Sequence, residues 1–152
     1  MLRLVLDSSV VIAAAQPDEP AHADARTFLD ALRRAESDQV RLFGPAELWL
    51  ETHVVEQRLA RSRRSSAPPA GALSGLVIEL VSPDRVEVVT VFLDLLARRM
   101  RGRKPSANAT DLVYLWAAHE VGATVVTLDR GLLGYHGVVC DVTRPQHVRL
   151  GR

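Results

Sequence analysis

Residues 2–12 read LRLVLDSSVVI, and this stretch decides the fold class. Residues 2–6 are mostly apolar, which is typical of a strand that is buried in a sheet. Asp7 ends the strand, two serines follow, and a second apolar run begins at Val10. A hydroxyl residue just before such a run is a common start of a helix. The stretch therefore predicts a buried strand that leads through an acidic residue into a helix.

The same alternation of apolar strands and amphipathic helices continues along the chain. Further strands are expected at residues 40–43, 123–128 and 138–140, while 76–81 fits either a strand or the end of a helix. Further helices are expected at residues 22–35, 45–60, 86–100 and 108–121. This order predicts an α/β fold with a mainly parallel sheet and helices on both faces. We expect a single domain over residues 1–152.

Length and composition exclude several protein classes. The chain has 152 residues, of which 47% are hydrophobic and 24% charged, so a disordered tail, a collagen-like repeat or a coiled-coil rod is excluded. The single cysteine, Cys140, excludes an internal disulfide and a zinc site built from cysteines. Apolar runs are too short for a membrane span, and Asp7 comes too early for a signal peptide. We expect a cytoplasmic protein that is not associated with a membrane.

Two acidic residues directly follow predicted strands. Asp7 ends the first strand, and Asp129 ends the strand at 123–128. Ligands of open α/β sheets bind at the carboxyl ends of the strands, so these side chains are expected to approach each other. Two carboxylates at close range repel each other unless a proton or a cation lies between them. Taken singly, either residue could instead be a helix cap.

Two further acids lie on predicted helices. Asp111 comes three residues after Asn108, in a first turn where the helix dipole favours an acid, so a capping role is an alternative. Glu51 lies three residues after Leu48 on the helix at 45–60, beside the apolar stripe. A carboxylate there costs free energy unless it is paired or bound to a metal. Glu47 is the rival acid on the same helix, further around from the stripe.

These residues resemble the motifs of the PIN-domain family. Asp7-Ser-Ser resembles the opening motif, and residues 45–51, with a proline six positions before Glu51, resemble the second. Residues 108–118 resemble the third motif, an acid that opens an Ala-rich helix, and 123–129 the fourth. The four motifs span roughly residues 2–142. Size and single domain are most similar to the VapC-type ribonuclease toxins of toxin–antitoxin pairs. Ser9 departs from the asparagine common in relatives, and residues 61–104 match no motif.

The resemblance implies an acidic pocket that holds Mg²⁺ or Mn²⁺ and hydrolyses RNA. Carboxylate oxygens are the hard ligands that both ions prefer. The resemblance implies that four acidic residues line this pocket and take part in catalysis: Asp7, Glu51, Asp111 and Asp129. Asp7, Asp111 and Asp129 are expected to bind the metal, and Ser9 and Thr127 to form hydrogen bonds with these carboxylates.

An acidic pocket repels the phosphate backbone of RNA, so positive charge is expected at its rim. Two segments, 61–64 and 98–104, are rich in arginine. Arg99, Arg101 and Arg103 are the expected RNA contacts, since arginine binds phosphate well. The alternative is that these residues are only solvated or stabilise the helix dipole.

The resemblance also implies protein partners, namely a cognate antitoxin and a second copy of the chain in a homodimer. Trp49, Leu50 and Val54 lie on the side of their helix opposite to the core stripe and are expected to form an exposed apolar patch. The alternative is that they pack under residues 61–75.

Other activities lack their sequence signals. The order of residues indicates no Ser-His-Asp or Cys-His site, and His53 and His119 are interpreted as surface or packing residues. Ser9 stands where a haloacid-dehalogenase-type fold would need an acid, and the chain has no Gly-rich phosphate loop. The alternative function is a non-catalytic PIN module that binds RNA or a protein.

Overall fold

The computed structural model describes residues 1–36, 38–62, 71–102 and 108–150. Its five strands form one sheet in the order β3-β2-β1-β4-β5, and all four strand pairings are parallel. The mainly parallel α/β sheet predicted from the sequence is therefore confirmed. The strands are β1 (Leu2–Leu6), β2 (Val40–Gly44), β3 (Ile78–Leu80), β4 (Thr124–Val126) and β5 (Val142–Thr143).

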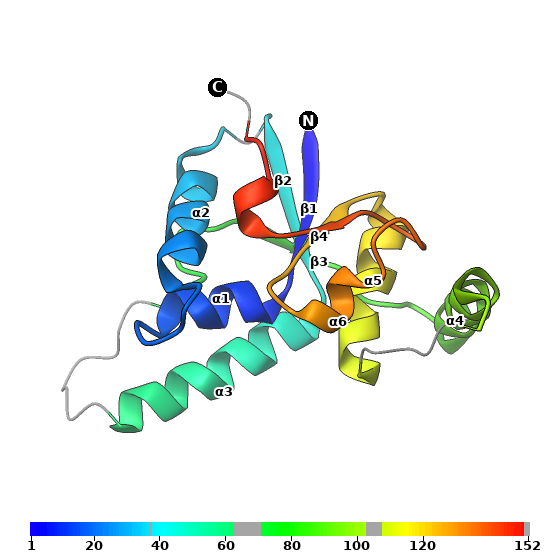
Figure 1. The fold of residues 1–152 in the computed structure, drawn as a ribbon, viewed down its shortest axis with the longest axis horizontal. Helices are drawn as coiled ribbons and strands as arrows, with labels where there is room; N and C mark the ends of the chain where they lie inside the picture. Colours follow the sequence, from blue (N-terminus) through cyan, green and yellow to red (C-terminus); the bar gives the residue numbers. More distant parts are fainter. Residues whose placement is uncertain (37, 63–70, 103–107, 151–152) are drawn as a thin grey trace.

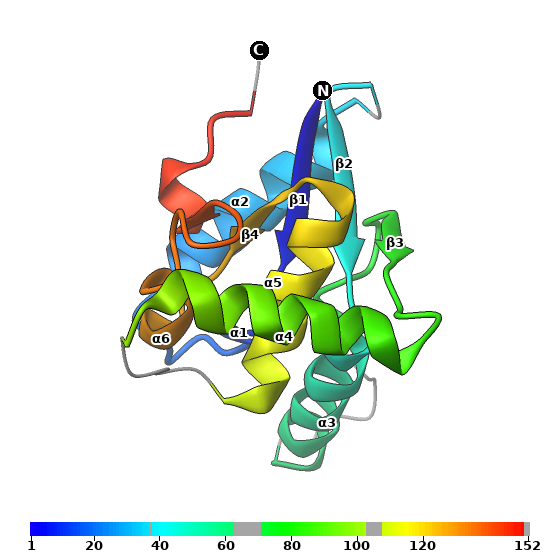
Figure 2. The ribbon, with the colours of Figure 1, turned by 90° about the vertical axis from the view of Figure 1, so that its right-hand side faces the viewer.

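Helices cover both faces of the sheet. Figure 1 shows α1 and α2 on one side of the central strands and α5 and α4 on the other, and Figure 2 shows α4 as the outermost layer, crossing over α5. A short 3-10 helix near the C-terminus packs beside α2. The helices are α1 (Ser8–Ala15), α2 (His22–Arg34), α3 (Ala46–Ser62), α4 (Val86–Met100), α5 (Ala109–Val121), α6 (Arg130–Leu133) and the 3-10 helix (Pro145–His147).

The core is centred on β1. Val5 and Leu6 are fully buried, since β1 is flanked by β2 and β4 and covered on both faces. On α5, five consecutive residues from Tyr114 to Ala118 are buried, because the helix lies between the sheet and α4. A helix that is apolar around most of its circumference is typical of such an inner layer.

The turn from β2 into α3 sets the position of Glu51. A β-carbon at Gly44 would lie 2.6 Å from Cδ2 of Leu48, which is fully buried. Only glycine therefore allows the end of β2 to approach the first turn of α3 this closely. Pro45 follows directly, as a residue that suits the start of a helix.

The C-terminal strand differs from the sequence prediction. Residues 138–140 do not form a strand; they lie in a turn closed by an isolated bridge between His136 and Cys140. The strand forms later, at Val142–Thr143. Gly137, with φ of 73°, bends the chain, and the amides of Val125 in β4 and of Thr127 just after it bond to the carbonyls of Asp141 and Thr143. Pairing with β4 thus overrides the strand propensity of Val138 and Val139.

Residues 76–81, for which the sequence left two interpretations open, contain the three-residue edge strand β3. Among the helices of the described residues, none has the length and apolar character needed to cross a membrane.

Candidate active site

The four predicted acids lie at one edge of the sheet. Figure 1 shows that α1, α3 and α6 begin where the strands end, and that the first turns of α5 reach the same edge. Asp7 and Asp129 immediately precede α1 and α6, Glu51 lies in the second turn of α3, and Asp111 lies in the first turn of α5. The parallel topology explains this gathering, since the carboxyl ends of all strands point the same way.

Asp7 is the most deeply buried of these acids, with 3% of its surface exposed. Its Oδ2 accepts hydrogen bonds from the Ser9 hydroxyl and from the Thr127 hydroxyl, the latter at 2.6 Å. The two hydroxyl oxygens in turn accept bonds from the backbone N–H groups of Leu128 and Asp129, at 3.0 and 2.9 Å. This chain of bonds fixes Asp7 between the ends of β1 and β4.

Burial raises the pKa of Asp7, because a charged carboxylate is less well solvated there than in water. The hydroxyls of Ser9 and Thr127 oppose the shift by stabilising the charged form, while the negative charge of Glu51 adds to it. The backbone at Asp7 is at the N-cap position of α1, but its side chain makes no capping hydrogen bond within the described residues. Helix capping thus does not account for this carboxylate.

Glu51 is held by a residue that the sequence did not single out. The Tyr114 hydroxyl donates to Oε2 of Glu51 at 2.9 Å, which links α5 to α3. Tyr114 is 1% exposed, and burial raises its pKa, so it stays a neutral donor. The signal in the sequence was a tyrosine three residues after Asp111 in an apolar helix, because a buried hydroxyl needs a partner.

The carboxylates of Asp111 and Asp129 cap the helices at whose N-termini they lie. Oδ2 of Asp111 accepts from the backbone N–H of Asn108 at 2.8 Å, in the capping box predicted from the sequence. Oδ1 of exposed Asp129 accepts from the N–H of Leu132 at 2.8 Å and caps α6. The capping alternative therefore describes both residues, whereas Asp7 and Glu51 accept hydrogen bonds from Thr127 and Tyr114, which are distant in the sequence.

The arrangement can be compared with what a divalent ion needs. Within the described ranges, no group of three or more acidic, histidine or cysteine side chains is close enough to hold a metal. Asp7 and Glu51 nevertheless form a pair of carboxylates near enough for one to raise the pKa of the other. Mg²⁺ is commonly bound by one or two carboxylates together with waters and substrate phosphate, so this pair fits such an ion.

The structure separates the two rival acids of α3. Glu51 lines an open surface pocket together with Ser8, which directly follows Asp7 in the chain. Glu47 lines a different cavity, with Phe92 and Trp116 in its wall. Glu51 is thus the α3 acid beside Asp7.

The arginines at the end of α4 have different surroundings. Arg99 donates from Nη1 to the Val138 carbonyl at 2.9 Å, which ties α4 to the turn after α6. Arg101 is exposed and has φ of 42° at the C-cap. Arg103 and Lys104 lie outside the described residues, as do Arg63 and Arg64.

The apolar patch expected on α3 is smaller than predicted. Leu50 and Val54 are 64% and 47% exposed. Trp49, however, is half-buried against the core, with Cζ3 3.5 Å from the β-carbon position of Gly44. Including Trp49 in the patch was wrong, because the missing side chain of Gly44 leaves room for the indole ring.

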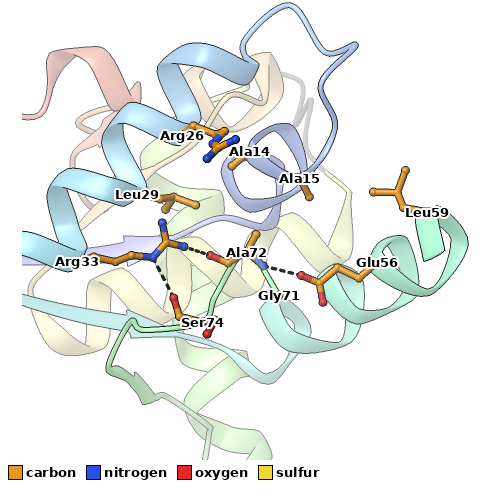
Figure 3. Close-up of a pocket in the computed structure, with 10 residues that line it drawn as sticks. All are labelled: Ala14, Ala15, Arg26, Leu29, Arg33, Glu56, Leu59, Gly71, Ala72 and Ser74. Carbon is orange, nitrogen blue, oxygen red and sulfur yellow. Dashed lines mark hydrogen bonds between the residues drawn. The ribbon is translucent and has the colours of Figure 1, made fainter. Parts of the chain in front are cut away.

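A further cavity, of about 400 Å³, lies away from the acids between α1, α2 and α3 (Figure 3). Gly71, Ala72 and Ser74 line one side of it. Arg33 donates to the carbonyls of Ala72 and Ser74, and Glu56 accepts from the N–H of Ala72 at 2.8 Å. Arg33 and Glu56 thus attach residues 72–74 to α2 and α3, so we assign them a structural role.

Comparison with known families agrees with this geometry. A family model described as the PIN domain matches residues 4–135, and the chain belongs to the PIN-domain family. The match includes residues 61–104, for which the sequence motifs gave no alignment. No curated protein shows significant sequence similarity to the chain.

Several solved structures have the same fold. VapBC2 from Rickettsia felis, bound to a DNA fragment from their promoter, has a TM-score of 0.61 at 15% identity, covering 93% of this chain and 98% of that one. FitAcB from Neisseria gonorrhoeae has a TM-score of 0.60 at 17% identity, covering 95% and 99%. PAE2754 from Pyrobaculum aerophilum has a TM-score of 0.56 at 21% identity, covering 92% and 89%.

Proposed function

We propose that this PIN domain is a metal-dependent endoribonuclease and the toxin of a toxin–antitoxin pair. The observation that carries the proposal is Asp7, a buried carboxylate at the strand ends, held by two hydroxyls and placed beside Glu51. Burying a carboxylate without a counter-charge is unfavourable, which is typical of a site that binds a cation. The motif resemblance to VapC toxins and the fold shared with VapBC2 support the nuclease class.

The residues of this site have different roles. Asp7, Asp111 and Asp129 would hold Mg²⁺ or Mn²⁺, with Glu51 beside Asp7. Asp111 and Asp129 each cap a helix through one oxygen and would bind the ion through the other, directly or through a water, since no three of these acids in the described residues lie close enough to hold it by themselves. Ser9 and Thr127 hold Oδ2 of Asp7, so that the carboxylate meets the ion in one orientation. Tyr114 positions Glu51 in the same way. When bound, the ion would supply a water of lowered pKa and neutralise charge on the scissile phosphate.

The purified protein is expected to cleave RNA in the presence of Mg²⁺ or Mn²⁺ and to leave DNA largely intact. Cleavage should stop with a chelator and return when either ion is restored. The measurement is gel analysis of single-stranded and structured RNAs, with a tRNA and an rRNA fragment included. Cleavage that persists with the chelator would contradict the metal site. Binding of RNA without cleavage of any substrate would favour the alternative, a non-catalytic module.

Arg101 and Arg99 are expected to respond differently to replacement by alanine. Arg101→Ala should weaken RNA binding and flatten its salt dependence by about 0.7–0.9 per lost phosphate contact. Arg99→Ala should instead lower the melting temperature by about 2–4 °C, because one hydrogen bond of roughly 1 kcal/mol is lost. Filter binding over a salt series and thermal melts distinguish the two effects. An unchanged salt slope in Arg101→Ala would mean that this residue is only solvated.

We also propose a homodimer that buries Leu50 and Val54, the exposed apolar residues of α3. Leu50→Ser should weaken the dimer, whereas Val91→Ser, at a residue of similar exposure on α4, should leave it unchanged. Light scattering at micromolar concentration is the measurement, and a monomeric wild-type protein would refute the proposal.

The antitoxin is proposed to be a small protein encoded in the neighbouring reading frame.

A further inference from the structure

The cavity beside Glu47 is not used by the acidic site. It has a volume of about 340 Å³, within the range of small-molecule pockets. It lies between the start of α3, residues 81–83 after β3, and the helices α4 and α5, where Figure 2 shows α4 crossing over α5. Its wall is mainly apolar and includes Val89, Phe92, Leu112, Val113 and Trp116.

Glu47 gives this apolar cavity one polar anchor. It is the only charged residue among the described residues of the wall, and its carboxylate has no hydrogen-bond or salt-bridge partner in the described chain. The indole N–H of Trp116, in the same wall, is also buried without a partner in that part of the chain. A ligand with N–H donors for the carboxylate, an acceptor for the indole N–H and an aromatic body would complement this wall.

The cavity adjoins the acidic site through two helices. Glu47 lies one helical turn before Glu51 on α3, and Leu112 directly follows Asp111 on α5. A nucleobase is joined to its phosphate through a single ribose. We infer from this adjacency that a base in the cavity would have its backbone toward the acidic edge of the sheet.

We propose that this cavity binds an unpaired guanine of the RNA substrate, with the carboxylate of Glu47 accepting hydrogen bonds from N1–H and the N2 amino group. Guanine is the base with two adjacent N–H donors on its Watson–Crick edge, which matches the two oxygens of a carboxylate. Aromatic and apolar side chains are the usual surroundings of an unstacked base in RNA-binding sites. The inference rests on the proposed ribonuclease function and assigns Glu47 to substrate selection.

Binding to the metal-free protein tests this proposal without any catalytic step. GMP, IMP and AMP are titrated into the Trp49→Phe variant, and binding is followed by the fluorescence of Trp116, the remaining tryptophan. GMP should bind about 10-fold more tightly than IMP, which lacks the N2 amino group, and than AMP. Glu47→Gln should remove this preference, while Glu87→Gln, an exposed acid of α4 outside the cavity, should keep it.

RNA cleavage provides the second readout. Replacing the guanines of a cleaved RNA with inosine, one at a time, should slow the wild-type enzyme about 10-fold at one position and leave Glu47→Gln unaffected there. Equal binding of the three nucleotides, together with metal-dependent cleavage that ignores inosine, would overturn the guanine site but not the nuclease. Preferential GMP binding without cleavage of any RNA would refute the nuclease and retain the base site. A Glu47→Gln variant changed only in oligomeric state would assign the cavity to a protein partner and overturn the proposal.

Discussion

Asp7→Asn is expected to lose RNA cleavage by about 10²–10³-fold while the protein remains folded. The substitution keeps an oxygen that can accept from Ser9 and Thr127 but removes the charge that would bind the ion. Loss of several kcal/mol of transition-state stabilisation by the metal corresponds to a rate change of this size. The measurement is the cleavage rate at saturating Mg²⁺ or Mn²⁺.

The same variant is expected to raise the melting temperature of the metal-free protein at neutral pH. The pKa of Asp7 is raised on folding, so the folded state binds the proton more tightly than the unfolded state. The contribution of this carboxyl group to the free energy of unfolding is therefore fully present below its pKa in the unfolded state. It is lost as the pH rises through its pKa in the folded state. Asparagine removes that loss, so the difference between variant and wild type should shrink as the pH is lowered toward the unfolded value.

Thermal melts with and without Mn²⁺ complete this test. Mn²⁺ should raise the melting temperature of the wild type, since a ligand that binds the folded state stabilises it, and should have little effect on Asp7→Asn. Asp94→Asn, at an exposed acid of α4, is the matched control and should behave as the wild type in every assay. If Asp7→Asn retained full activity, the proposed site would be wrong.

Glu51→Gln should also lose activity by about 10²-fold or more, whereas Glu47→Gln should retain it on RNA substrates that lack guanine. The reason is position, because Glu51 affects the electrostatics of Asp7 while Glu47 faces another cavity. Glutamine at position 51 can still accept from the Tyr114 hydroxyl, so the fold should be retained. Loss of activity on such RNAs in Glu47→Gln but not in Glu51→Gln would exchange their roles.

The Tyr114→Phe variant tests whether the orientation of the Glu51 carboxylate matters in addition to its charge, because it removes the hydroxyl that donates to Glu51. We expect a loss of about 10–100-fold, which is typical for partners that orient a metal-site residue, and little further loss when it is combined with Glu51→Gln. Tyr135→Phe is a matched control, because Tyr135 is equally buried but its hydroxyl has no partner in the described residues. Equal effects of both tyrosine variants would indicate a packing role alone.

The sequence was sufficient to predict the fold because its signals are local. The apolar run of β1 ends at an acid, Gly44 and Pro45 mark the entry to α3, and Asn108 and Gly122 flank α5. The prediction of a strand at 138–140 was wrong because the position of this strand depends on contacts that are not local. Whether that segment or Val142–Thr143 pairs with β4 depends on the turn at Gly137 and on the amides of a distant strand.

The sequence by itself determined which acids follow strands and which open helices, and hence that they gather at one edge of a parallel sheet. Only the tertiary structure decided how each is held. Asp7 and Glu51 are bonded by Thr127 and Tyr114, residues 120 and 63 positions away in the chain, while Asp111 and Asp129 cap their own helices. It also decided that Glu51 lies near enough to raise the pKa of Asp7, whereas Glu47 lines a separate cavity. The physical reason is that helical periodicity fixes the angle between two side chains of one helix, whereas packing fixes which neighbour each side chain meets.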